Sequence, residues 1–498
     1  MARYRGGARS ASKHSGDQYS QGFQYRDPQI TDIVLGPWEE IDFTNPIPTD
    51  KDPRKCLNGL SSGILRNGEI RPYMRASEAI GGTLPVIGIF EAKVGTTTYA
   101  LILQKNASDQ LVIINNGTTD TFTTIAVTTT GTVRGFQWGD YFYFGSPGIA
   151  TGLVRYTLST RAINEPATSH TALYDLFLLD NNAVSIELVS NTWLVSWSVD
   201  SSPENWTSAG SGNTTYYDSP YRKAVAYNRY AVLMFGDYAI RMEATGTADP
   251  TFMFNKLDQI PGALSRDAVA GIGNYVIYVG MDYRTYALSN DRVVLVSDHT
   301  IPYNNSAMLT PRVSLLKGLS VVAIAYDHNA TPYGYYINEE LKIVGQPHRQ
   351  WSFAATADGY LYNYAAWASS TLKVHLIQTS PGGSLVSVGQ PYFITSMIDL
   401  GEDMVIEYID VFLANQSAPT NMHITLVGRY NDITSSTITT ELTSPHINLA
   451  FNPRYFINQT FRSFYITNPT GGTWTTLAAI TKIVVRVRRQ KITSISRG

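Results

Sequence analysis

Short runs of alternating apolar and polar residues recur along the middle of the chain. In residues 273–289, Tyr275, Ile277 and Val279 alternate with their neighbours, and the alternation resumes after a turn. A period of two is typical of a β-strand that has two different faces. A single hairpin is only marginally stable in water, so the sequence predicts further strands beside this one.

Similar hairpins follow one another at intervals of 37 to 52 residues, with a mean of about 43. They begin near Tyr99, Tyr141, Trp193, Tyr230, Tyr275, Val321 and Tyr360. A four-stranded propeller blade takes about 40 to 45 residues, so this period predicts a β-propeller of six or seven blades over residues 85–390. An ordinary β-sandwich is the alternative, because frequent turns occur in any all-β chain.

The segments that flank the repeat differ from it. Residues 31–84 contain Pro37, Pro46, Pro48 and Pro53, which exclude a long helix, and we expect an extended strap along the propeller or a closing strand for its ring. Residues 391–498 contain five or more strand-like runs without the blade period, and we expect a β-sandwich-like C-terminal domain there. The best helical candidate, residues 171–183, could equally be a strand, so the predicted fold class is mainly β.

The first 30 residues form a polar, basic arm among Gly, Ser and Gln residues. Its cations include Arg3, Arg5, Arg9 and Lys13. Composition alone is typical of a disordered tail. Because the arm has no apolar face with which to order itself, the alternative is that it lies against a neighbouring subunit or a partner protein.

The composition narrows the class of protein. Charged residues make up 16% of the 498 residues, against roughly 25% on average, which suggests that some of the surface is buried in subunit contacts. The net charge of −2 gives no overall attraction to nucleic acid, so any such binding must be local.

The sequence also bears on the compartment. Cys56 is the only cysteine, so no intrachain disulfide can form, as expected for a protein assembled in a reducing cytosol. The N-terminus has no apolar core of a secretory signal, and no run approaches the roughly 18 apolar residues of a membrane helix, so we expect no membrane insertion.

The chain carries no recognisable catalytic or cofactor motif. Its eight histidines show no metal-binding spacing, and it contains neither a phosphate-binding glycine loop nor a nucleophile elbow. We therefore expect no cofactor, no metal and no enzymatic activity.

One segment, residues 197–206 (WSVDSSPENW), approximates the repeated box of propeller sialidases through Ser198, Asp200 and Trp206. The box occurs only once, and Ser202 stands where the sialidases have glycine. The structural alternative is an Asx turn made by Asp200, with Trp206 packed between two blades.

The order of these parts resembles the tail hub, or nozzle, proteins of short-tailed bacteriophages, also called packaged-DNA stabilisation proteins. The likeness rests on an Arg-bearing polar N-terminus, a Pro-rich strap, the motif Gly68-Glu69-Ile70-Arg71-Pro72, the Trp197-Ser198…Pro203…Trp206 turn, and a closing β-domain.

This resemblance implies a structural virion protein without enzymatic activity, assembled in the bacterial host cytoplasm. Six copies would form a ring that extends the DNA channel below the portal and adaptor, retains the packaged double-stranded DNA, and docks tail fibres or tail tip proteins. Two alternatives stay open. One is a glycan-binding or sialidase-like propeller acting on the host surface, with an Arg cluster and a carboxylate or Tyr nucleophile at the ring axis; the other is a general protein-interaction propeller.

The last predicted strand is basic. Lys482, Arg486 and Arg488 share one of its faces, and the apolar residues Ile483, Val485 and Val487 share the other, which should face the core. No acidic residue follows Glu441, so we expect a locally positive face. It would belong to an edge strand whose charges discourage aggregation, or it would touch DNA phosphates in the channel or an acidic face of the adaptor.

Overall fold

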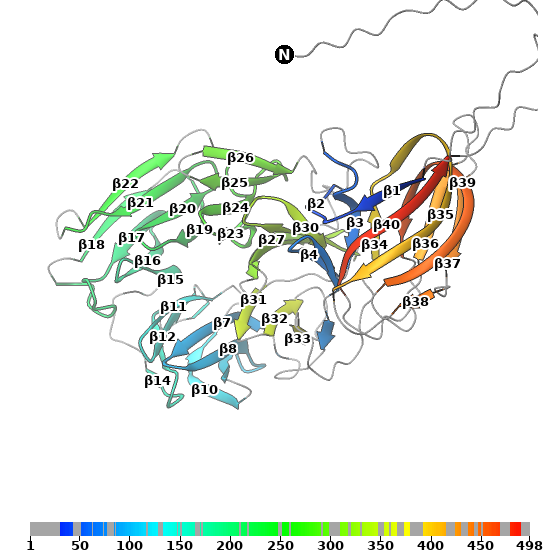
Figure 1. Cartoon of the computed structure of the whole chain (residues 1–498). Helices are drawn as coiled ribbons and strands as arrows, with labels where there is room; N and C mark the ends of the chain where they lie inside the picture. The colour runs from blue at the N-terminus through cyan, green and yellow to red at the C-terminus, as the bar shows by residue number, and fades with distance from the viewer. Residues whose placement is uncertain are drawn as a thin grey trace, which may run out of the picture.

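The computed structural model of the chain describes residues 30–489, apart from gaps between its strands. The longer gaps are residues 43–50, 77–83, 298–308, 347–352, 366–372, 379–391, 415–423, 430–436 and 469–478, and the others span one to five residues. The described residues are almost entirely β (Figure 1), and the helical element described among them is the short 3-10 helix η1 (Arg266–Ala268). The arm residues Arg3, Arg5, Arg9 and Lys13 lie outside the described residues.

Among the described residues, six four-stranded sheets occupy most of the middle of the chain (Figure 1). The first contains β7 (Val86–Val94), β8 (Thr97–Lys105), β9 (Gln110–Asn115) and β10 (Thr118–Ala126), the second β11 (Arg134–Trp138), β12 (Tyr141–Gly145), β13 (Val154–Thr157) and β14 (Ile163–Asn164), and the third β15 (Leu173–Leu179), β16 (Asn182–Val189), β17 (Thr192–Trp197) and β18 (Gly212–Tyr216). The fourth contains β19 (Tyr221–Ala226), β20 (Tyr230–Phe235), β21 (Ala239–Ala244) and β22 (Phe252–Leu257), the fifth β23 (Val269–Ile272), β24 (Tyr275–Val279), β25 (Thr285–Ser289) and β26 (Arg292–Ser297), and the sixth β31 (Phe353–Ala357), β32 (Tyr360–Ala365), β33 (Lys373–Gln378) and β6 (Met74–Ala76).

A seventh group of four strands pairs in the same order but forms one end of a larger sheet. It contains β27 (Leu309–Leu316), β28 (Val321–His328), β29 (Thr331–Asn338) and β30 (Ile343–Gln346). All pairs within these seven groups are antiparallel, as expected for strands joined by short turns.

The seven groups follow one another in a propeller-like arrangement. The first strand of one group lies against the first strand of the next at β11 and β15, β15 and β19, β19 and β23, β23 and β27, β27 and β31, and β31 and β7. The step from β7 to β11 is bridged by the amide of Val133, which donates to the carbonyl of Ile87 at 2.8 Å. The succession of sheets therefore returns to its start.

Apolar side chains fill the space between neighbouring sheets. Between the first and second sheets, Leu103, Ile113, Phe142 and Tyr156 belong to one buried cluster. A strand that packs between two sheets buries both of its faces, so several strands, such as β20, are apolar at nearly every position. The helical candidate is strand in its described part, since β15 and the start of β16 fall there on either side of a turn.

The two ends of the chain build one further sheet, which reaches sixteen strands together with β27–β30. Its other members are β1 (Ile30–Leu35), β2 (Glu40–Ile41), β3 (Cys56–Ser61), β4 (Gly63–Arg66), β5 (Glu69–Pro72), β34 (Tyr392–Thr395), β35 (Ile398–Leu413), β36 (Ile424–Arg429), β37 (Thr437–Leu442), β38 (Ile447–Leu449), β39 (Asn452–Thr467) and β40 (Ile480–Arg489). The strands pair in the order β3-β34-β39-β35-β40-β5-β4-β30, and β30 also pairs with β3. The path thus closes around one apolar core, which includes Leu57, Ile409, Phe464 and Val485.

This sheet joins segments that the sequence analysis separates. Strands β1, β3 and β5 of the expected strap pair with β40 or β34 of the C-terminal block. Strand β2 pairs with β3, β4 pairs with β5 and β30, and β6 continues into the sixth four-stranded sheet. The described strands of the C-terminal block are linked by pairing into this one sheet. Alternation identifies a strand and its buried face but not its partner, and here the partners come from opposite ends of the chain.

Candidate functional site

The turn at residues 197–206 is built around a buried serine. The Ser198 hydroxyl accepts a hydrogen bond from the Ala183 amide at 2.9 Å, and the Ser198 carbonyl accepts one from the Asn182 side chain at 2.8 Å. Asp200 is exposed, because the chain has reversed between Val199 and Ser202 and leaves it at the tip. Asn205, not Asp200, makes the Asx turn: its Oδ1 atom accepts the Thr207 amide hydrogen at 3.4 Å and also that of Ser208 at 3.2 Å.

The same turn connects the second and third sheets. Glu204 accepts hydrogen bonds from the Tyr143 hydroxyl at 2.8 Å and from Arg155 Nη1 at 2.6 Å, and both donors lie on the second sheet. Trp206 packs edge-on against His170, with ring centroids 4.3 Å apart, and borders an apolar cluster shared by the two sheets. Burial raises the pKa of Tyr143, so its hydroxyl keeps its proton and remains a donor to Glu204. These contacts give Ser198 and Trp206 a structural role.

The C-terminal strand β40 alternates as expected. Ile483, Val485 and Val487 are buried in the core of the closed sheet. Lys482, Arg486 and Arg488 lie on the opposite, outward face. However, β40 is not an edge strand, because β35 pairs with one side of it and β1 with the other.

Carboxylates from distant parts of the chain neutralise this face, so the expectation of a strongly positive surface is wrong. Arg486 forms a two-pronged pair with Asp32, at 2.7 and 2.8 Å, and Arg488 lies 2.7 Å from Glu407. The hydrogen bond from Arg486 also lowers the pKa of Asp32. Lys482 lies over the ring of Phe412, 4.4 Å from its centroid. The sequence after Glu441 lacks acids, but β1 and β35 supply them.

Apolar and aromatic residues surround these ion pairs. We call Ile30, Asp32, Val34, Tyr408, Phe456 and Arg486 the outer face of the closed sheet. Tyr408 lies between two guanidinium groups, 4.0 Å from Arg454 and 5.0 Å from Arg486. Three large apolar residues are exposed beside it: Ile30 at 54%, Val34 at 41% and Phe456 at 39%.

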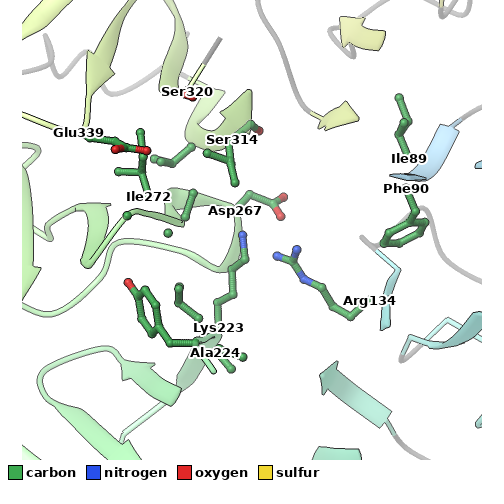
Figure 2. A pocket seen from close by; sticks show the side chains of 18 of the residues that line it. Ile89, Phe90, Arg134, Lys223, Ala224, Asp267, Ile272, Ser314, Ser320 and Glu339 are labelled. Carbon is green, nitrogen blue, oxygen red and sulfur yellow. The ribbon is translucent and has the colours of Figure 1, made fainter. Parts of the chain in front are cut away.

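A second candidate site is a cavity of about 570 Å³ among the first strands of the four-stranded groups, which we call the axial cavity. Strands β7, β11, β19, β23 and β27 contribute to its lining. Figure 2 shows the side chains of Arg134, Lys223 and Asp267 converging within it. The Lys223 amine donates a hydrogen bond to the Val269 carbonyl.

Further charges lie behind these residues. The guanidinium of Arg266 lies over the ring of Tyr174, 4.7 Å from its centroid. The Asp175 carboxylate is buried; its Oδ1 atom accepts the Leu176 amide hydrogen at 2.9 Å, and its Oδ2 atom accepts hydrogen bonds from the Tyr221 hydroxyl at 2.7 Å and the Ala224 amide at 2.9 Å.

Burial changes how the groups at the axial cavity ionise. It lowers the pKa of Lys223 well below that of a free lysine, and the nearby Arg134 acts in the same direction. Burial also lowers the pKa of Arg266 and raises that of Tyr221 well above that of a free tyrosine. Tyr221 is therefore a neutral hydrogen-bond donor to Asp175 and not an ionisable nucleophile.

Sequence reasoning missed this cluster. Its clearest sequence signal is a charged residue inside an otherwise apolar first strand, as with Asp175 in β15; Lys223 follows Arg222 in β19 and gives no such signal. A charged residue is costly to bury, so its presence in a buried strand is informative. The spacing of hairpins does not depend on such residues and so does not reveal them.

Neither a metal site nor a membrane helix appears in the part of the chain that the structure describes. No three His, Cys, Asp or Glu side chains there are grouped so that they could hold a metal ion. No helix of the described residues is long and apolar enough to cross a membrane.

Comparison with known proteins identifies no family. No family model matches the sequence, and no curated protein matches it. Among solved structures, the chain is similar to the computationally designed Ika8 protein (TM-score 0.36, 10% identity, 60% of this chain and 99% of that one) and to BamB from Moraxella catarrhalis (TM-score 0.36, 10% identity, 70% and 98%). It is also similar to PorZ of Porphyromonas gingivalis (TM-score 0.39, 11% identity), where the match covers 76% of this chain and 48% of the other.

Proposed function

We propose that this chain is a structural subunit of the tail nozzle of a short-tailed bacteriophage. In this proposal several copies, six by the family resemblance, form a ring that continues the DNA channel below the adaptor and retains the packaged genome. The order of parts in the sequence supports the proposal.

We further infer that the seven groups of four strands are seven blades of one propeller. Strands β27–β30 would be the sixth blade, shared with the closed sheet, and β31–β33 the seventh. The pairing of β6 with β33 supports this inference, because it would close the ring with a strand from the N-terminal side.

The observation that carries the nozzle proposal is the outer face of the closed sheet. Three exposed apolar residues lie there among charged side chains that already form ion pairs. Exposed apolar groups beside satisfied ion pairs suit a contact with another protein surface. We assign this face to the contact between neighbouring subunits.

The same charges bear on the candidate DNA contacts. Four cations and three carboxylates lie around the outer face, so its net charge is +1. The cations are Lys482, Arg454, Arg486 and Arg488, and the carboxylates are Asp32, Glu407 and Asp410. Retention of DNA by phosphate contacts requires cations that are free to replace counterions, and three of these four are paired with carboxylates. The balance favours a protein neighbour for this strand over DNA.

The glycan-cleaving alternative is less well supported. It requires a tyrosine or carboxylate that can act as a nucleophile beside an arginine cluster. Arg134 lines the axial cavity with the carboxylates of Asp267 and Glu339. Tyr221 is not available there as a nucleophile, because it is buried, its pKa is raised, and its hydroxyl is engaged by Asp175.

The mass of the particle that the full-length chain forms in solution tests the proposal. We expect size-exclusion chromatography with light scattering to show a closed oligomer, and mass spectrometry to find the chain in purified phage particles. Phe456→Asp should abolish the oligomer, because it places a charge in the apolar contact, while the circular dichroism spectrum stays unchanged. The matched control is Leu295→Asp, at an equally exposed leucine (37%) on β26, which should leave the oligomer intact.

A wild-type chain that stays monomeric and is missing from the particles would overturn the proposal. A monomer that hydrolyses sialosides would instead establish the glycan-cleaving alternative.

A further inference from the structure

Lys223 has no ion-pair partner among the described residues around the axial cavity. It belongs to β19, it is half-buried, and Figure 2 shows its amine beside Asp267 and Arg134 in the cavity. The amine donates a hydrogen bond to the Val269 carbonyl, and no carboxylate of the described residues lies within ion-pair distance of it. A neutral acceptor satisfies an uncharged amine as well as a charged one, so this contact does not require the protonated form.

The charges around the amine do not compensate for its removal from water. Arg134 of β11 and Arg266 of η1 oppose a positive charge on it, whereas Asp175 of β15 and Asp267 of η1 favour one. The two effects partly cancel, and burial, supported by Arg134, lowers the pKa of Lys223 well below that of a free lysine. A lysine that is desolvated and lies next to a cation is nucleophilic at a pH where an exposed lysine is protonated.

We propose that Lys223 is a modification site, at which a small aldehyde with an apolar body forms an imine inside the axial cavity. The amine nitrogen attacks the carbonyl carbon and loses one proton, and the carbonyl oxygen gains one. That oxygen then leaves as water with the second proton of the nitrogen, and a carbon–nitrogen double bond remains. Because Asp267 lies beside the amine (Figure 2), its carboxylate can carry these protons.

The lining of the cavity suits an uncharged ligand. Arg134 and Lys223 stand against the carboxylates of Asp267 and Glu339, so the lining gives no strong attraction to an ion of either sign. Apolar residues form much of the remaining wall, among them Ile89, Phe90, Val225, Ile272 and Leu315. The volume of about 570 Å³ has room for an aromatic aldehyde.

Reductive labelling of the full-length chain with benzaldehyde and sodium cyanoborohydride, followed by peptide mass mapping, tests this site. Lys93 of β7, an exposed lysine, serves as the internal reference. At pH 7 we expect Lys223 to be labelled at least about tenfold faster than Lys93, because each unit by which a pKa is lowered raises the neutral fraction of an amine about tenfold. The labelling rate at Lys223 should also reach its plateau at a lower pH than the rate at Lys93.

Two variants test whether the neighbouring cation contributes. Arg134→Gln should slow the labelling of Lys223 at pH 7, because the amine then holds its proton more tightly. The matched control Arg292→Gln, at an exposed arginine of β26, should leave the rate unchanged.

The proposal is overturned if Lys223 is labelled no faster than Lys93 at pH 7, or if a folded Arg134→Gln variant is labelled as fast as the wild type. If Arg134→Gln does not fold, as judged by circular dichroism, the pH dependence of the wild type decides. Parallel profiles for the two lysines then overturn the proposal equally.

Discussion

At the scale of single residues, Lys223 at the axial cavity is unusual because four other charged side chains lie around it. It faces Arg134 from β11, Asp175 from β15, and Arg266 and Asp267 from η1. Burial and the neighbouring guanidinium groups lower its pKa below the value of about 10.5 that it has in the unfolded chain. Between those two values the unfolded chain holds one more proton than the folded chain, so folding becomes more favourable as the pH rises.

This linkage predicts the effect of Lys223→Met. The free energy of unfolding of the wild type should rise with pH above the lowered pKa of Lys223 and up to about pH 9, which lies below the usual pKa of tyrosine. The variant should lose this slope and should exceed the wild type in stability most clearly at the lower end of that pH range. Urea titrations at several pH values in a phosphate-free buffer measure both effects, and parallel profiles for the two proteins would contradict the assignment.

Gly262 is required for a close approach between the fourth and fifth sheets. The Gly262 carbonyl accepts the Met281 amide hydrogen at 3.1 Å, and the next residue, Ala263, donates to the Phe235 carbonyl at 3.2 Å. A Cβ atom at position 262 would lie 1.6 Å from the carbonyl oxygen of Gly236. Because that atom is backbone, it cannot move aside as the end of a flexible side chain could.

We therefore expect Gly262→Ala to destabilise the fold by about 3 kcal/mol, the upper part of the range for overpacking. The matched control is Gly59→Ala in β3, where the nearest atom to the new Cβ is Ile394 Cδ1 at an ordinary 3.8 Å. That variant should change stability by less than about 1 kcal/mol. Thermal and urea unfolding would show the contrast, and equal effects of the two substitutions would argue against a close approach at Gly262.

At the scale of elements, the turn at residues 197–206 shows how one short segment fixes two sheets. Its Ser198 end is anchored within the third sheet, and its Glu204 end reaches Tyr143 and Arg155 on the second. The sialidase-like pattern of this segment has a physical explanation without catalysis, since a buried hydroxyl, a tight turn and a packed tryptophan hold the sheets in place.

Glu204→Ala should therefore destabilise the protein by about 1 kcal/mol, a value reduced for the 36% exposure of the Glu204 side chain. Glu243→Ala is a matched control, because Glu243 is similarly exposed at 39% and pairs with Arg241 of its own strand. It should change stability by less than about 0.5 kcal/mol. If Glu243→Ala lowers the free energy of unfolding as much as Glu204→Ala does, the contact between the two sheets contributes no more to stability than an ion pair within one strand.

The strands themselves were well predicted from periodicity. Tyr141, Tyr230, Tyr275, Val321 and Tyr360 each begin the second strand of a four-stranded group. Trp193 instead lies in the third strand of its group, and this displacement explains the uneven intervals of 52 and 37 residues around it. Counted from Asn182, at the start of the second strand, the intervals from Tyr141 and to Tyr230 become 41 and 48.

Pairing between remote strands was not predictable in the same way. Nothing in the sequence near Arg486 indicates that Asp32 lies opposite it, because the two residues meet only through the pairing of β1 with β40. The axial cavity was missed for a similar reason: Arg134, Lys223 and Asp267 belong to three different sheets or connections and converge only when the groups of strands assemble. The local sequence pattern predicts which face of a strand is buried. Only the assembled fold shows which strands and side chains lie next to one another.

At the scale of the whole molecule, the propeller-like part and the closed sheet share a hydrogen-bonded connection. Strand β30 pairs with β29 on one side and with β4 on the other, so backbone hydrogen bonds continue from one part into the other (Figure 1). A connection of this kind transmits force better than a flexible linker does. A ring subunit that bears the pressure of packaged DNA, as we propose, would use such a connection.

Strand β6 has a consequence for the order in which the protein can fold. Residues 74–76 are made early during synthesis, but their partner, residues 376–378 of β33, is among the later segments to appear. The sixth four-stranded sheet therefore cannot be completed until most of the chain has left the ribosome, and contacts between such distant residues form slowly. Limited proteolysis of stalled nascent chains should show residues 74–76 becoming protected only after residue 378 has emerged. Protection at shorter lengths would mean that the early strand first docks elsewhere and is exchanged later.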